Sequence, residues 1–400
     1  MQSIPSYKSI WQISFPIFLS MLAQNIIILV DTVFLGRVGE IELGASAIGG
    51  LFYLCLYLIG FGFGVGSQII IGRRNGESNF RKIGEIFDHS TLFLLLLAVV
   101  FFFLTKATYA NIMGHILRSP DIFHEVTVYL DIRVWGLLFA YVNVAFRAFY
   151  VGITKTKFIS YSAAIMALVN IALDYVLIFG HYGFPEMGIK GAALASVIAE
   201  GTSVCFFILI TLKKVDIRKY SLFRFWPIQW QTIKNILNIA VFIMLQFFIS
   251  VVSWFSFFLI IEQTGERPIA VSNIVRSLYM ILTIPIWGLG ATTNTIVSNM
   301  MGENRIDGII PAIFRIAKIS FFSILVVIAV TWLFAREMIS LYTDNVSLIN
   351  DALGPLYVVL GVMLVFSISI VIFNGVAGTA NTKTSLIIEI VAILIYLTLA

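Results

Sequence analysis

The sequence predicts an all-α polytopic membrane protein, and its composition and its apolar pattern both indicate this class. Of its 400 residues, 60% are hydrophobic and only 12% are charged, whereas a soluble domain carries about 25% charged residues. The apolar residues form long unbroken runs, and a helix that crosses a bilayer needs roughly 20 of them. A membrane β-barrel would instead alternate polar and apolar residues over ~10-residue segments. The long runs therefore predict membrane helices.

The apolar runs predict eleven spans, which cover residues 10–35, 43–71, 88–104, 128–150, 159–179, 191–212, 235–261, 270–297, 316–334, 354–377 and 384–400. Lys and Arg favour the cytoplasmic side of a membrane protein. With a cytoplasmic N-terminus, 17 of them fall on that side and 7, Arg133 included, on the other. We therefore expect the N-terminus in the cytoplasm. The net charge of +5 follows from this pattern and does not indicate a nucleic-acid partner.

Two motifs recur 226 residues apart, which predicts an internal duplication. The first motif is Gly62-Phe63-Gly64 with Gly76-Glu77, repeated as Gly288-Leu289-Gly290 with Gly302-Glu303. The second is Gly152-Ile153-Thr154-Lys155-Thr156-Lys157, repeated as Gly378-Thr379-Ala380-Asn381-Thr382-Lys383. Small residues are common where membrane helices pack closely, so the glycines alone are weak evidence for a duplication. The offset that both motifs share is stronger evidence. An even number of spans per half predicts parallel repeats, related by an axis along the membrane normal.

The duplication predicts an N-lobe with spans 1–6 in residues 1–212, a basic cytoplasmic linker in residues 213–234 and a C-lobe in residues 235–400. At the same offset, the counterparts of spans 159–179 and 191–212 would run past Ala400. We therefore expect the chain to lack the end of an eleventh helix and all of a twelfth.

Ionisable side chains inside membrane spans are costly and mark functional sites by default. Gln24 and Asp31 share one face of the first span, and Asn170 and Asp174 form an i, i+4 pair in the fifth. Asp31 and Asp174 lie at similar depth, so their carboxylates are expected to converge. Oxygen ligands suit a small hard cation, and carboxylates that share a desolvated site can bind and release a proton near neutral pH. The other interpretation is that these acids cap helix ends or pair with basic residues at the surface.

Several further residues are candidates. Glu200, in the sixth span, could join the acidic cluster. Pro16 removes a backbone hydrogen bond and can bend the first span. The second half lacks the acids, because Phe257 stands at the position equivalent to Asp31. Its aromatic residues are expected either to line a pocket for lipophilic cations or to pack against lipid and helices; they include Trp254, Phe257, Tyr279 and Trp287.

Motifs for an enzyme or an ATP-driven pump are missing from the sequence. It has no Gly-x-x-x-x-Gly-Lys-[Ser/Thr] phosphate loop, no His-Glu-x-x-His and no Gly-x-Ser-x-Gly. We therefore expect a protein that is not an enzyme and needs no cofactor apart from a coupling ion.

Three segments together resemble the multidrug and toxic compound extrusion (MATE) family. The first holds Pro16, Gln24 and Asp31-Thr32-Val33-Phe34-Leu35-Gly36-Arg37-Val38-Gly39; the second runs from Gly60 to Gly72 and on to Asn75-Gly76. The third, which is the most specific, is Asn170-Ile171-Ala172-Leu173-Asp174-Tyr175 followed by Gly188-Ile189-Lys190-Gly191-Ala192-Ala193. The resemblance covers nearly the whole chain.

The resemblance implies twelve helices in two six-helix lobes around a V-shaped cavity. It also implies export of cationic or lipophilic organic compounds, in exchange for H⁺ or Na⁺, by a monomer in a bacterial inner membrane. One branch of the family couples through its N-lobe, which here implies Asp31, Asn170 and Asp174, with Gln24 nearby and Pro16 at the bend. Another branch uses an acid in the seventh helix, and residues 248–254 hold none.

Two points stay open on this resemblance. The family's hydroxyl group on the sixth helix corresponds to either Ser196 or Thr202. The alternative function is that of a flippase for lipid-linked oligosaccharides, which belongs to the same superfamily.

Overall fold

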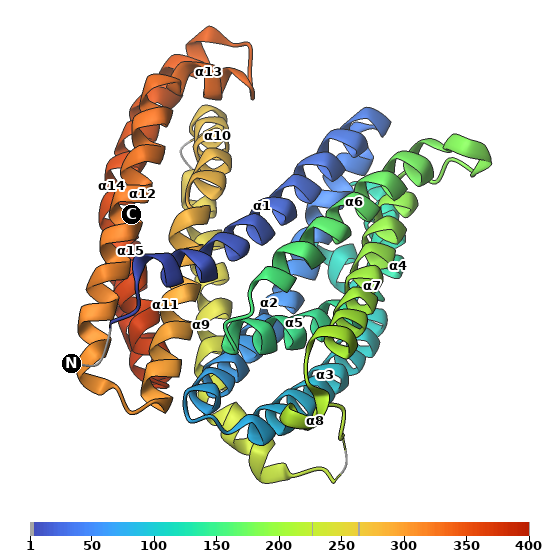
Figure 1. Cartoon of the computed structure of the whole chain (residues 1–400). Coiled ribbons are helices and arrows are strands. Elements are labelled where there is room, and N and C mark those ends of the chain that lie inside the picture. The colour runs from blue at the N-terminus through green and yellow to red at the C-terminus, as the bar shows by residue number, and fades with distance from the viewer. Residues whose placement is uncertain (1–3, 226, 263–264, 400) are drawn as a thin grey trace.

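The computed structural model describes residues 4–225, 227–262 and 265–399, and all regular structure in these ranges is helical. The helices form two lobes that diverge in a V (Figure 1). By length and apolar composition, eight helices of the described part can each cross a membrane, and two bent helix pairs can each add one more span. The chain is therefore an integral membrane protein, as its composition predicts.

The N-lobe is built from the first half of the chain. Its elements are α1 (Tyr7–Val38), α2 (Glu40–Gly76), α3 (Phe80–Ile116), α4 (Pro120–Arg133), α5 (Gly136–Gly152), α6 (Lys157–Phe179), the 3-10 turn η1 (His181–Gly183) and α7 (Ile189–Lys214). Residues 215–229 connect it to α9 and contain the short helix α8 (Ile217–Tyr220). This connection lies inside the linker predicted at 213–234.

The C-lobe repeats the pattern. Its elements are α9 (Trp230–Glu262), α10 (Glu266–Leu282), α11 (Ile284–Gly302), the 3-10 turn η2 (Ile306–Gly308), α12 (Ile309–Leu333), α13 (Ala335–Ser340), α14 (Val346–Gly378) and α15 (Thr382–Leu399). Two spans expected to be continuous are broken instead. Span 128–150 is the pair α4 and α5, bent by 50°, and span 270–297 is the pair α10 and α11, bent by 45°.

The ends of the helices follow from local sequence. The hydroxyl of Ser6 accepts a hydrogen bond from the backbone of Ser9 and begins α1. The carboxamide of Asn345 accepts bonds from two backbone N–H groups in the first turn of α14. Gly180 ends α6 with a φ of 72°, a left-handed conformation that glycine adopts without strain. These residues satisfy backbone groups that the helices leave free at their ends.

The two lobes meet where α2 and α11 end, called here the closed end, and their contacts are reciprocal. A Cβ atom on Gly76 would lie 2.0 Å from the carbonyl oxygen of Asn299, and one on Gly302 would lie 1.9 Å from that of Arg73. Arg73 and Asn299 are themselves 226 residues apart, as are the two glycines. The Gln68 amide likewise donates to Asn294, its own counterpart in the repeat, at 3.4 Å. The recurring glycines thus let one helix from each lobe cross on a pseudo-two-fold axis.

The second repeated motif also has one role in both lobes. A Cβ on Gly152 would lie 3.1 Å from the carbonyl oxygen of Gln68, and one on Gly378 would lie 2.8 Å from that of Asn294. The Thr156 hydroxyl donates to the carbonyl of Gln12 on α1 at 3.4 Å. Its counterpart Thr382 donates to a carbonyl of α9 at 2.9 Å. Each motif therefore fixes its helix turn against the first two helices of its own lobe.

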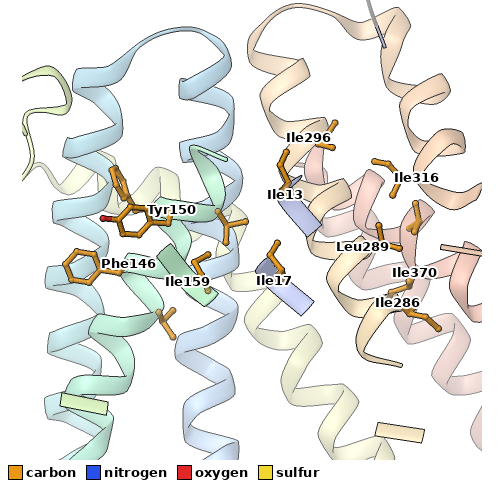
Figure 2. Close-up of a cluster of buried hydrophobic side chains, with 14 of the residues drawn as sticks. Ile13, Ile17, Phe146, Tyr150, Ile159, Ile286, Leu289, Ile296, Ile316 and Ile370 are labelled. Carbon is orange, nitrogen blue, oxygen red and sulfur yellow. The ribbon is translucent and has the colours of Figure 1, made fainter. Parts of the chain in front are cut away.

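The first helix lies between the two lobes. Near its start, the buried side chains of Ile13 and Ile17 belong to one apolar cluster that spans both lobes. Figure 2 shows them between Tyr150 of α5 on one side and Leu289 of α11 on the other. The helix packs along α6 in its own lobe and also contacts α11 in the other. It is therefore in a position to transmit movement from one lobe to the other.

We expect Gly76→Ala and Gly302→Ala each to lower the melting temperature of the detergent-solubilised protein. Each added methyl group would meet backbone atoms of the opposite lobe, and overpacking of this kind costs about 1–3 kcal/mol. The two losses should be similar, because the contacts are reciprocal. Gly361→Ala is the control, since nothing lies within 4 Å of a Cβ at Gly361. Unchanged melting temperatures for both Gly76→Ala and Gly302→Ala would contradict the close crossing.

Candidate functional site

Asp31, Asn170 and Asp174 come together where α1 packs along α6. In the amide orientation that matches donors to acceptors, Asn170 Nδ2 donates to Asp31 Oδ1 at 3.1 Å and to Asp174 Oδ2 at 3.2 Å. The side chains of Asn170 and Asp174 are 1% and 0% exposed, and Asp31 is half-buried. One amide group thus bridges two carboxylates inside the N-lobe. These three residues are called the carboxylate cluster below.

The carboxylate cluster contains two acidic residues and no basic residue. The two carboxyl groups both accept from the same Asn170 amide nitrogen. Asp174 Oδ1 is buried, and no hydrogen-bond partner for it lies in the described part of the chain. Two adjacent carboxylates in a dry site cannot both stay charged without a cation or a proton. The arrangement can therefore bind H⁺ or a small cation such as Na⁺.

Gln24 and Pro16 lie on α1 before the carboxylate cluster. Gln24 is exposed, two helical turns from Asp31, and Pro16 is buried. The helix continues through Pro16 without a break. Proline lacks the N–H group that would bond to the carbonyl of Gln12, and that carbonyl accepts the Thr156 hydroxyl instead. The missing hydrogen bond makes this the turn of α1 that bends at least cost.

Glu200 is half-buried and lies outside the carboxylate cluster. It forms a bidentate ion pair with Arg133. Arg133 Nη2 donates to Glu200 Oε1 at 2.6 Å, and Arg133 Nη1 donates to Glu200 Oε2 at 3.0 Å. Arg133 was counted with the outer basic residues although it falls inside the predicted span 128–150; in the structure its side chain is 11% exposed and lies at the end of α4. Opposite charges inside the apolar runs 128–150 and 191–212 are the signal that could have revealed the pair.

The two candidate hydroxyl groups of α7 have different environments. Thr202 donates to the carbonyl of Ile198 in its own helix at 2.9 Å. Ser196 is half-buried. Ser203, which the sequence analysis missed, donates to Asn143 at 2.9 Å and is bonded to Ser162 at 2.6 Å. Ser203 therefore connects α7 to both α5 and α6.

The four aromatic candidates of the C-lobe take part in separate contacts. Trp254 lies under the guanidinium of Arg276, 4.9 Å from the ring centroid. Phe257 packs on Tyr396 with the ring centroids 5.3 Å apart. Tyr279 and Trp287 both contact Phe366 of α14, with centroid distances of 6.4 and 5.8 Å. A role in a pocket for these residues stays a prediction.

The C-lobe also holds a half-buried acid that was not among the candidates selected from the sequence. The Ser250 hydroxyl of α9 donates to Glu389 of α15, which is half-buried. Within the described residues, no group of three or more His, Cys, Asp and Glu side chains converges as a metal site would require. The carboxylate cluster therefore offers two acids and an amide, a set that suits a weakly held, exchangeable cation.

Comparison with known proteins identifies the family. The MatE family model matches residues 16–176 and 242–400, and these two stretches begin 226 residues apart, at the offset of the internal repeat. The chain is 26% identical, over 78% of its length and 68% of the relative's, to a probable multidrug resistance protein NorM of Agrobacterium fabrum. It is 24% identical to a second NorM, from Pasteurella multocida, over 96% of this chain and 83% of that protein.

A solved structure has the same fold. It is the outward-facing conformation of a multidrug resistance MATE family transporter, with a TM-score of 0.88 and 20% identity over 97% of this chain and 86% of that one. Because the family model covers most of the sequence in two repeats, and because this fold is shared along nearly the whole chain, the protein belongs to the MatE family of membrane transporters.

Proposed function

We propose that this protein is a secondary antiporter that exports cationic or lipophilic organic compounds in exchange for H⁺ or Na⁺. The observation that carries the proposal is the carboxylate cluster, in which Asn170 bridges Asp31 and Asp174 while one oxygen of Asp174 has no hydrogen-bond partner among the described residues. Its relatives' names, which describe probable multidrug resistance proteins, support the substrate class.

We further propose a bacterial inner membrane, a cytoplasmic N-terminus and a monomer. The closed end of the V holds the junctions that carry most of the Lys and Arg residues, which favours the cytoplasmic side for this end. The lobes then diverge toward the outside (Figure 1). The fold shared with an outward-facing MATE transporter supports this orientation.

The mechanism follows from the position of α1. Asp31 lies where α1 packs on α6, whereas Phe18 of the same helix lies beside Gly288 of α11 in the other lobe. A cation or proton that binds between Asp31 and Asp174 removes their repulsion and lets α1 settle closer to α6. The turn at Pro16 absorbs the resulting bend. Because the cation binds the two conformations with different affinity, it shifts the lobes from one to the other.

We expect purified protein in liposomes to export a fluorescent cationic dye when a pH gradient or a Na⁺ gradient is imposed. Only one of the two gradients should drive export, because the carboxylate cluster exchanges one kind of ion for substrate. The measurement is dye efflux under each gradient separately, with protein-free liposomes as the control. No efflux under either gradient, from protein that remains folded, would overturn the proposal.

We expect Asp31→Asn and Asp174→Asn each to reduce gradient-driven export by roughly a hundredfold or more, because a neutral amide no longer needs a cation. Glu389→Gln is the matched control, since it also removes a half-buried carboxyl group, but from the C-lobe. It should retain export within a few-fold of the wild type. Export lost in Glu389→Gln and kept in Asp174→Asn would move the coupling site to the C-lobe.

One observation favours a second candidate, a flippase for lipid-linked oligosaccharides. The guanidinium of Arg147 lies over the ring of Phe61, 5.4 Å from its centroid, in a narrow gap that Gln68 also lines. Phe61 packs against Phe247 of the C-lobe, so this arginine lies near the contact between the lobes. Arginine is a residue of choice for the recognition of phosphate groups. Translocation of a lipid-linked oligosaccharide in liposomes, lost in Arg147→Gln, would support this function.

A further inference from the structure

A half-buried ion pair, within electrostatic reach of Asp31, has no role in the mechanism described so far. Arg133 is the last residue of α4, and Glu200 lies in the middle of α7. Their side chains are 11% and 14% exposed and are joined by two hydrogen bonds of 2.6 and 3.0 Å. Two parallel bonds between a guanidinium and a carboxylate fix the orientation of both groups as well as their distance.

Tyr53 and Gly136 contact this ion pair and leave room for it. The Tyr53 hydroxyl donates to Glu200 at 3.2 Å, and the Tyr53 ring lies 3.7 Å from the guanidinium of Arg133. A Cβ atom on Gly136 would come within 2.1 Å of Arg133 Nη1 and 2.4 Å of Glu200 Oε2. The ion pair therefore occupies the space that glycine leaves at the bend between α4 and α5.

The charge of Arg133 also reaches the carboxylate cluster. It acts on the carboxylate of Asp31, and Tyr129, one turn earlier on α4, interacts with both Asp31 and Arg133. The titratable groups that interact with Arg133 come from four helices and are Asp31 of α1, Tyr53 of α2, Tyr129 of α4 and Glu200 of α7. Apart from Glu200, Asp31 is the only carboxylate in this group.

An arginine released at this position would compete with the transported cation. Its side chain keeps its charge in proteins, and a buried charge without a partner is strongly unfavourable. Pairing with Asp31 would relieve that cost and would fill the carboxylate cluster with a cation that cannot leave. Glu200 prevents this by giving the guanidinium a complete partner of its own.

We propose that Glu200 holds Arg133 away from Asp31 and Asp174, so that the carboxylate cluster stays open to the transported cation. Glu200 and Arg133 are positioning residues for cation binding, and the inference rests on the proposed antiport function. Because Arg133 sits at the bend between α4 and α5, a change in this bend also changes its distance from Asp31. The ion pair thus sets how tightly the cluster binds its cation.

The test compares Glu200→Gln, Arg133→Gln and the double variant in the liposome assay, as a function of the external concentration of the driving cation. Glu200→Gln should raise the concentration for half-maximal export by roughly tenfold or more, because the freed arginine occupies the cluster. The double variant should return this concentration to within a few-fold of the wild-type value. Glu389→Gln serves as the control for loss of a half-buried carboxyl group.

The outcomes separate this inference from the proposed function. If the wild type exports and Asp174→Asn does not, the antiport function holds, and Glu200→Gln then tests the ion pair alone. A wild-type half-maximal concentration in Glu200→Gln would overturn the inference. So would a double variant that folds but stays as impaired as Glu200→Gln, because Glu200 would then act by itself rather than through Arg133.

A second route covers the case in which Glu200→Gln fails to fold. Gly136→Ala keeps both charges but forces them apart, so it should raise the half-maximal concentration in the same direction. Arg133→Gln added to Gly136→Ala should reverse the effect, since a shorter neutral side chain no longer competes for Asp31. Failure of this reversal in a folded protein would overturn the inference.

Discussion

Within a lipid bilayer, a polar atom finds no water, so each one must be paired inside the protein or bear a cost of several kcal/mol. This constraint organises the molecule at every level. Thr156 pairs the backbone carbonyl that Pro16 leaves free, and Gln68 pairs with Asn294 where the lobes cross. Glu200 pairs Arg133 within a shell of further hydrogen bonds. Against this background, the two adjacent carboxylates share one amide, and Asp174 Oδ1 has no hydrogen-bond partner in the described part of the chain.

Much of the fold follows from the sequence, because apolar run length and small-residue motifs act locally. The offset of 226 residues was visible in Gly76 and Gly302, and the structure gives these glycines the same contact from opposite sides. The bends were not predictable in this way. The breaks near Val134 and Thr283 fall inside continuous apolar runs, and only packing against neighbouring helices determines where each run bends.

The candidate site, like the fold, was only partly predictable from the sequence. Asp31, Asn170 and Asp174 could be selected because a charged residue inside a span stands out, and the structure brings all three together. Glu200 stood out for the same reason but was assigned to the wrong neighbours, because a sequence does not show which of several buried charges lie together. Its partner Arg133 was missed because it was counted with the solvated basic residues of the outer side, although it falls inside the predicted span 128–150. Arg133 is the last residue of α4, at the bend between α4 and α5.

The central claim is that the carboxylate cluster binds the ion that is exchanged for substrate. Equilibrium binding to the purified protein tests it most directly, by measuring bound ²²Na⁺ and proton uptake or release together as a cationic substrate is added. The account predicts that substrate displaces one kind of ion from the wild type and that Asp174→Asn neither binds nor releases it. The same ion binding and displacement in Asp174→Asn as in the wild type would contradict the account.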